Sequence, residues 1–168
     1  VMGEMVRALP ATPEFSTMPV SASVSDREGH LLRPFTTPDG RWRLPTTRAD
    51  VDPRFLDMLI AYEDRGFAEH EGIAWSSMLR AGLQFIGAGG RVVSGGSTLT
   101  MQVARLIEGE PTRNLYGKLR QMVHASRLER ELSKDDILER YLTLAPYGGN
   151  IEGIRAASLA WFGKEPAR

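Results

Sequence analysis

Apolar residues recur at helical spacing across positions 55–60, and this pattern most constrains the fold of the 168-residue chain. Asp52 and Pro53 precede it in the order of a helix start, a capping carboxylate followed by proline at the first helical position. The pattern predicts a helix over 52–64 with one apolar face. Extended by one turn, that face reaches Glu63 instead of an apolar residue.

A carboxylate at the end of such a face would be partly removed from water. Partial dehydration disfavours the charged form, so we expect the pKa of Glu63 to be raised toward that of a useful proton acceptor. The alternative is a structural acid neutralised by Arg65 or His70, because structural ion pairs also perturb pKa values. Both interpretations predict that this side chain faces other residues of the chain.

Composition excludes several classes of protein. Hydrophobic residues make up 42% and charged residues 25% of the chain, as in ordinary globular domains, which excludes disordered and fibrous classes. The 21 basic and 21 acidic side chains balance, so no general nucleic-acid-binding surface is indicated. The absence of cysteine excludes disulfides and thiolate metal sites. No apolar run approaches the roughly 18 residues of a transmembrane helix.

The chain is the size of one domain, with an extended lead-in over 1–25 and the domain proper over 26–168. Short segments at 24–33 and 41–44 flank turn-forming residues, which predicts a small β element with Trp42 as its core residue. The remainder is predicted to be mainly α. Helical spacing predicts further helices at 73–86, 97–106, 114–132, 133–145 and 153–161.

Two of these helices carry specific expectations. The helix over 73–86 has a wide apolar band that includes Trp75 and Leu79, and Arg80 is its only charged residue. We expect this band to be core, with contact to a bilayer surface as the alternative. In the helix over 114–132 the residues expected to point inward are Leu115, Leu119, Met122 and Leu128.

Glycines at 87–96 predict a mobile loop that ends at a helix start. A dinucleotide site and a P-loop are excluded, because no strand precedes the glycines and no lysine precedes Ser97 and Thr98. Ser97 is the expected N-cap of the next helix. Hydroxyl groups and free backbone N–H groups at a helix start suit an anion, although an ordinary surface cap is the alternative.

Residues 105–130 carry six basic and three acidic side chains, the largest local excess of positive charge in a chain whose net charge is zero. Such a run is usually a solvated helix face. Beside an anion-binding helix start, however, Arg105, Arg113 and Lys118 predict a clamp for pyrophosphate.

Residues from Glu63 to Gly72 follow the pattern E-D-x-x-F-x-x-H-x-G, and residues 95–102 read G-G-S-T-L-T-M-Q. In this order the two stretches resemble the first two motifs of the peptidoglycan glycosyltransferases, glycosyltransferase family 51, the glycan-polymerising domain of class A penicillin-binding proteins. In the second motif, Met101 replaces the usual glutamine.

The third motif, a basic residue followed by K-x-x-E and a later L-E, shows one departure, because Gln121 replaces the second acidic residue of the family. Together with A-P-Y-G-G-N at 145–150, this replacement resembles the 1C branch of class A penicillin-binding proteins. The fourth and fifth motifs are matched at 133–142 and 161–164, and we interpret both as core packing.

The resemblance implies a mainly α, lysozyme-like domain with a small N-terminal β element. It implies an inverting hexosyltransferase that polymerises lipid II into β-1,4-linked glycan strands and releases undecaprenyl pyrophosphate, with Glu63 as general base. The residues implied as supports are Asp64, Phe67, His70 and Gln121. Those implied in pyrophosphate binding are Ser97, Thr98, Gln102, Arg105, Arg113 and Lys118.

The resemblance also implies partners and a location. A divalent cation, Mg²⁺ or Mn²⁺, is the expected cofactor, its ligands are not identified, and no organic cofactor is expected. Expected partners are lipid II, the growing glycan strand, the cytoplasmic-membrane surface and a C-terminal transpeptidase domain; no nucleic acid is expected. The chain would then be a fragment of a longer protein, anchored by a segment outside it at the periplasmic face of the bacterial inner membrane.

Two alternative functions stay open at this point. A lysozyme-like hydrolase also uses a dehydrated glutamate, as a general acid, but needs no phosphate clamp. A catalytically impaired module that binds lipid II or polyprenyl pyrophosphate is the other, because Gln121 cannot supply a negative charge.

Overall fold

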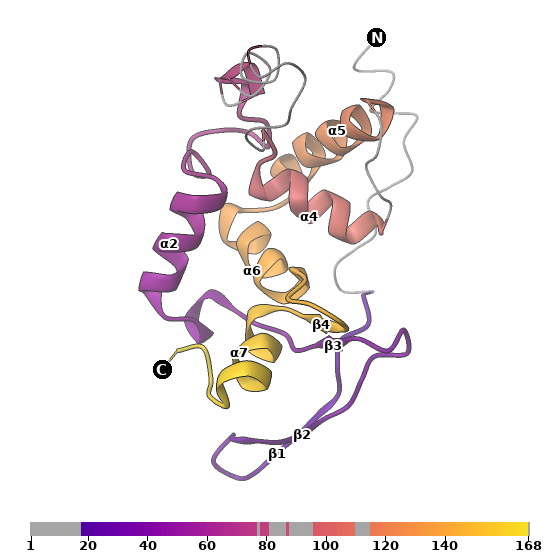
Figure 1. The fold of residues 1–168 in the computed structure, drawn as a ribbon, viewed down its shortest axis with the longest axis vertical. Helices are drawn as coiled ribbons and strands as arrows, with labels where there is room; N and C mark the ends of the chain where they lie inside the picture. Colours follow the sequence, from indigo (N-terminus) through magenta and orange to yellow (C-terminus); the bar gives the residue numbers. More distant parts are fainter. Residues whose placement is uncertain (1–17, 77, 81–86, 88–95, 110–114, 168) are drawn as a thin grey trace. The chain divides into compact units, whose positions relative to one another are not determined.

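The computed structural model describes residues 18–76, 78–80, 87, 96–109 and 115–167. These residues are mainly α-helical with short strands, which confirms the predicted fold class (Figure 1). In chain order the elements are β1 Ser23–Ser25, β2 Leu31–Pro34, β3 Trp42–Arg43, η2 Arg48–Asp50, α2 Pro53–Glu63, α4 Leu99–Glu108, α5 Leu115–Glu131, α6 Lys134–Leu144, β4 Ile151–Glu152 and α7 Ile154–Phe162.

The chain divides into two compact units that are each assembled from separate stretches of sequence. One consists of residues 1–12 and 58–137, and the other of residues 13–57 and 138–168. Within the described residues no helix is both long and apolar enough to cross a membrane.

The first unit is built on the packing of α4 against α5, which lie side by side in Figure 1. Met101 of α4 and Met122 and Ala125 of α5 form its buried apolar cluster, and Ile73 and Met78 pack against them. The end of α2 and the loop that follows it belong to the same unit. The candidate site lies entirely in this unit.

The second unit contains both pairs of strands. β1 and β2, in the predicted β element, form an antiparallel hairpin, and the Asp26 carboxylate accepts the backbone N–H groups of Glu28 and His30 in the turn. β3 pairs in parallel with β4, a pairing that the sequence did not predict. It carries a buried ion pair in which Arg43 Nη2 lies 2.6 Å from Glu152 Oε2. β1 begins at Ser23, inside the predicted lead-in, whose first 17 residues lie outside the described part of the chain.

The helices predicted over 52–64, 97–106, 114–132, 133–145 and 153–161 are present, with small shifts at their ends. Residues 77, 81–86 and 88–95, which belong to the helix predicted over 73–86 and to the loop predicted over 87–96, lie outside the described residues. The helix expected over 97–106 is α4, and Thr98 instead of Ser97 is its N-cap, because the Thr98 hydroxyl accepts the backbone N–H of Met101. Ser133 forms a capping box before α6: its hydroxyl accepts the backbone N–H of Asp136 and the Asp136 carboxylate accepts that of Ser133.

Several residues expected to be buried are exposed. Leu119, Trp75 and Leu79 are 51%, 60% and 67% exposed, and Met78 is the member of the 73–86 band that packs inward. Trp161 and Phe162, in the fifth motif, are 64% and 74% exposed. Helical spacing identifies a stripe of apolar residues, but no element among the described residues packs over these exposed side chains within their own unit.

Trp42 is also less buried than predicted. It is half-buried and lines an apolar cavity of about 370 Å³, while Leu44 beside it is the fully buried residue of this region. The inward direction predicted for Met122 and Leu128 is confirmed, since both are buried. The side chain of Leu115 lies outside the described residues.

Candidate active site

Glu63 is the last residue of α2 and its side chain is half-buried. Its Oε2 accepts a hydrogen bond of 2.9 Å from Nε2 of Gln102 on α4. A hydrogen bond from an amide fixes the orientation of the side chain. The structure therefore places two predicted site residues in direct contact, one from each of two helices.

Asp64 joins the end of α2 to the start of α4. Its buried Oδ2 accepts the backbone N–H of Leu99 at 2.9 Å, and both carboxylate oxygens lie within 3.0 Å of His70 Nε2. The backbone N–H of Gly72 donates to His70 Nδ1, so Nδ1 is the acceptor and Nε2 carries the proton that Asp64 accepts.

Internal groups occupy part of the anion seat predicted at the backbone of the helix start. The N–H of Leu99 donates to Asp64, and the Thr98 hydroxyl and carbonyl accept the N–H groups of Met101 and Gln102. Thr98 also donates its hydroxyl proton to the carbonyl of Gly72 at 2.7 Å. Side chains of the protein thus cap part of the helix start, and the prediction of an anion bound there stays a prediction.

Phe67 and His70 support the loop between α2 and α4. Phe67 is buried, and the Lys134 ammonium lies 4.7 Å from the centre of its ring. Lys134 also donates to the carbonyl of His70 and to Glu129, and Glu129 accepts the Thr100 hydroxyl at 2.5 Å. These contacts fix the loop that carries Asp64 and follows Glu63.

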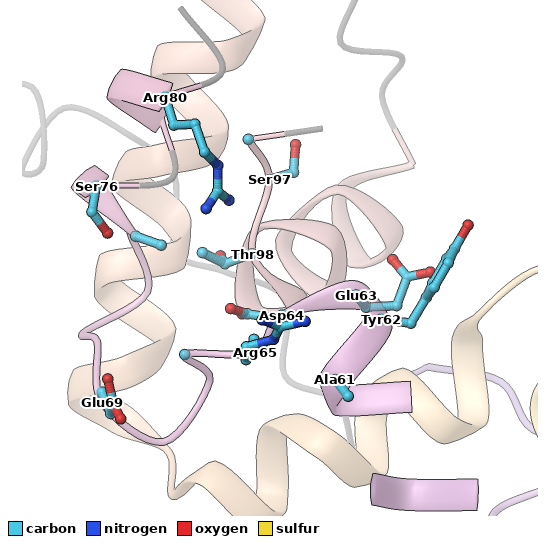
Figure 2. Close-up of a pocket in the computed structure, with 13 residues that line it drawn as sticks. Ala61, Tyr62, Glu63, Asp64, Arg65, Glu69, Ser76, Arg80, Ser97 and Thr98 are labelled. Carbon is cyan, nitrogen blue, oxygen red and sulfur yellow. The ribbon is translucent and has the colours of Figure 1, made fainter. Parts of the chain in front are cut away.

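A cavity of about 610 Å³ opens between this loop and the start of α4 (Figure 2). Glu63, Ser97, Thr98 and Arg80 are among the residues that line it. Its size is within the range of pockets that bind small molecules. Arg80 was not predicted as a site residue, although a single charge in an otherwise apolar helix was a signal that could have found it.

Cationic groups gather around Ser97. The Lys118 ammonium, on α5, donates to the Ser97 hydroxyl. Burial lowers the pKa of Lys118, and the nearby positive charge of Arg105 lowers it further. Two cations held close together, of which Lys118 is half-buried and Arg105 exposed, favour an anion between them. Arg113, the third predicted member of the clamp, lies outside the described residues.

Gln121 faces the backbone of α4 and does not line the cavity. Its side chain is 2% exposed and its Nε2 donates to the Met101 carbonyl at 2.7 Å. Its Oε1 is buried and accepts no hydrogen bond from the part of the chain that the structure describes. The replacement of glutamate by glutamine therefore affects the packing of α5 against α4 and not the lining of the cavity.

The described residues do not form a metal site of protein ligands alone. Among them, no three histidine or acidic side chains converge on one point. The Asp64 carboxylate is bound by Leu99 and His70, and one oxygen of Glu63 is bound by Gln102.

Comparison with known proteins decides the family. A family model described as Transglycosylase matches residues 28–168. The chain belongs to the transglycosylase family. Its mainly α, lysozyme-like fold and the predicted resemblance to class A penicillin-binding proteins are confirmed.

This transglycosylase domain is similar to parts of larger proteins. It is 51% identical to penicillin-binding protein 1C of Escherichia coli (strain K12) over 141 residues, 84% of this chain and 18% of that protein. It is 37% identical to the biosynthetic peptidoglycan transglycosylase of Azoarcus sp. (strain BH72) over 110 residues, 66% of this chain and 47% of that protein. It is 36% identical to penicillin-binding protein 1F of Bacillus subtilis (strain 168) over 145 residues, 86% of this chain and 20% of that protein. The chain thus spans less than half of each relative.

Proposed function

We propose that this transglycosylase domain is a peptidoglycan glycosyltransferase that polymerises lipid II into β-1,4-linked glycan. The observation that carries the proposal is the direct contact of Glu63 with Gln102, one helical turn before Arg105 on α4. A proton acceptor and cations for a phosphate leaving group are thus presented by adjacent elements. The name of the Azoarcus relative, a biosynthetic peptidoglycan transglycosylase, supports the same reaction.

In the proposed reaction the growing strand is the donor and lipid II is the acceptor. The acceptor 4-hydroxyl oxygen attacks the donor sugar C1, and its proton passes to Glu63. The bond between C1 and the pyrophosphate oxygen breaks, and its electron pair leaves with undecaprenyl pyrophosphate. A single displacement inverts the α-linked donor to a β-1,4 link. A positioned base is needed because a sugar hydroxyl is a very weak acid.

The basic side chains near Ser97 would stabilise the leaving group. Negative charge accumulates on the pyrophosphate as the bond to C1 breaks, and fixed cations lower the energy of that transition state. Lys118 and Arg105 supply this charge. An anion between them would relieve their mutual repulsion, which supports their assignment to the pyrophosphate.

The placement of Gln121 supports a catalytic domain over a binding module. Because Gln121 lies in the contact between helices, its lack of charge takes nothing from the cavity that holds Glu63. The hydrolase alternative is less well supported, because cleavage of a glycosidic bond needs no cations for pyrophosphate. Incubation with purified glycan strands tests it, and shortened strands would favour hydrolysis.

We also propose that the domain works at the periplasmic face of the bacterial inner membrane, in a longer protein with an anchor and a transpeptidase domain. The lipid tail of the substrate requires a membrane nearby. Exposed Trp75 and Leu79 supply apolar side chains suited to the bilayer surface. The need for Mg²⁺ or Mn²⁺ stays a prediction, which addition and chelation of each metal would test.

The decisive experiment is gel separation of the products that the purified chain makes from labelled lipid II. The unmodified chain should produce a ladder of glycan. Glu63→Gln should lower turnover by about 100-fold or more while lipid II binding is retained, because the amide cannot accept the proton. Asp57→Asn is the matched control, since Asp57 is an exposed acid on the same helix. Near-native turnover by the Glu63 variant would refute its assignment as the base.

A further inference from the structure

Arg80 brings a positive charge into the cavity from a segment separate from the basic residues on α4 and α5. It lines the same cavity as Glu63, Ser97 and Thr98. Figure 2 shows its side chain extending from a short helical piece toward Thr98, while Glu63 lies apart from it, toward the right of the view. Lys118 is not among the residues that line this cavity.

The proposed reaction presents two pyrophosphate groups at different distances from the base. The donor pyrophosphate is bonded to the reacting carbon and has to lie next to the reaction centre. The acceptor pyrophosphate is separated from the reacting 4-hydroxyl by both sugar rings of the disaccharide. A site that aligns both substrates therefore needs one cationic group close to the base and another farther away.

The basic residues of the unit match this demand. Arg105 is one turn beyond Gln102, which binds Glu63, so its position is suited to the donor. Arg65 also lines the cavity, but its backbone starts within about 7 Å of Glu63, because only Asp64 separates them in the chain. Arg80 is supplied by another segment, and Figure 2 shows its side chain apart from Glu63, on the side of the cavity lined by Ser76 and Ser97.

We infer that Arg80 binds the pyrophosphate of the acceptor, a dianionic lipid-linked disaccharide whose 4-hydroxyl meets Glu63. A guanidinium group suits this role because it can donate two parallel hydrogen bonds to phosphate oxygens. The inference rests on the proposed function and adds a substrate-positioning residue to it. Arg80 would align the acceptor without taking part in proton transfer or in departure of the leaving group.

The test uses a reaction in which one donor molecule is coupled to one acceptor molecule, so that the two substrates can be varied independently. The donor is labelled lipid II blocked at its own 4-hydroxyl, which cannot be extended. One acceptor is a charged lipid II analogue in which carbon replaces the oxygen between the sugar C1 and phosphorus. The resulting phosphonate cannot leave, so this analogue cannot act as a donor. The other acceptor is a neutral alkyl glycoside of the same disaccharide. Each reaction then forms a single bond, and KM and kcat can be measured for each partner.

Arg80→Gln should raise KM for the charged acceptor by about tenfold, as expected for loss of one charge-assisted contact. KM for the neutral acceptor and for the blocked donor should stay unchanged. Arg80→Lys should recover part of the loss, because it keeps the charge without the bidentate geometry. Arg130→Gln is the matched control, since Arg130 is exposed on α5 and outside the cavity.

Three outcomes would overturn the inference: no change for the charged acceptor, an equal change for both acceptors, or a larger change for the donor. An equal change for both acceptors would indicate a structural role, and thermal unfolding of each variant checks this independently. The proposed function itself fails only if the unmodified chain makes no polymer from lipid II. If that chain polymerises lipid II and Arg80→Gln behaves like it, only the assignment of Arg80 is wrong.

Discussion

At the scale of single residues, the contacts of Gln121 explain why an amide stands at its position. Its Nε2 donates to the Met101 carbonyl in a buried contact between α4 and α5. A carboxylate in the same place would put its own oxygen opposite the Met101 carbonyl oxygen, and both are hydrogen-bond acceptors. Its negative charge would also be buried without a partner. The glutamate that the family usually has here would need different surroundings.

Gln121→Glu is therefore expected to destabilise this chain although it restores the usual family residue. The loss should be about 1–3 kcal/mol, the range for a buried polar group left without its hydrogen bond. Polymerisation should not increase, because the side chain does not line the cavity. Urea denaturation and a lipid II polymerisation assay measure the two effects.

Gln121→Met provides the matched control, since it keeps the length of the side chain and removes the donor without adding a charge. It should cost less stability than the glutamate variant at neutral pH. Higher polymerisation by Gln121→Glu, at unchanged stability, would show that position 121 serves the reaction after all.

The sequence predicted most of the side chains that meet in the site. Asp64, His70 and Gln102 were expected near Glu63 from a resemblance in motifs, and the structure places them within hydrogen-bonding contact of it or of its loop. Arg80 was missed, because its position depends on how a helical segment lies over the cavity. Periodicity within one helix carries no information about that position.

At the scale of elements, helical spacing predicted the helices but not which parts of their surfaces are covered. Leu119 and Trp161 lie on predicted apolar faces, yet both are exposed. The parallel pair of β3 and β4 was missed altogether, since each strand has two residues and shows no periodic pattern. Its partners, such as Arg43 and Glu152, are 109 residues apart in the chain.

Gly72 shows how closely the loop after α2 approaches α5. Its φ is +85°, and a Cβ at this position would lie 2.8 Å from the carbonyl oxygen of Ala125. Gly72→Ala should lower the unfolding midpoint, through about 1–2 kcal/mol of left-handed strain plus the cost of displacing the loop. Activity should fall as well, because Gly72 binds both His70 and Thr98.

Gly109→Ala separates these two costs. Gly109 has a φ of +67°, and a Cβ there would meet nothing within 4 Å. It should therefore show the conformational cost alone and keep its activity. If both variants lost the same stability and the same activity, close contact between the loop and α5 would not explain the effect at Gly72.

At the scale of the whole molecule, the net charge is zero, so the pH dependence of stability is determined by individual buried groups. With 21 basic and 21 acidic side chains, general charge repulsion is small near neutral pH. The pH dependence of stability then comes from groups whose pKa differs between the folded and unfolded chain. Composition could not predict which groups these are, because the two units are assembled from stretches far apart in sequence.

His124 is such a group. Its side chain is 2% exposed, and its Nε2 lies 3.0 Å from Glu108 Oε1 without the geometry of a hydrogen bond. Burial lowers the pKa of His124 below 6.5, and the positive charges of Arg120 and Arg127 lower it further, while Glu108 partly opposes the shift. The folded chain therefore holds this imidazole neutral at pH values where the unfolded chain protonates it.

Stability should accordingly fall as the pH drops through about 6.5 toward the lower pKa of folded His124, because the unfolded chain takes up a proton that the folded chain does not. The slope from this group can approach about 1.4 kcal/mol per pH unit, the value for one proton. Urea denaturation of the unmodified chain and of His124→Gln between pH 8 and pH 5 measures it. The variant cannot titrate at this position, so its free energy of unfolding should fall less steeply below pH 6.5. Parallel curves for the two proteins would show that folding leaves the pKa of His124 unchanged.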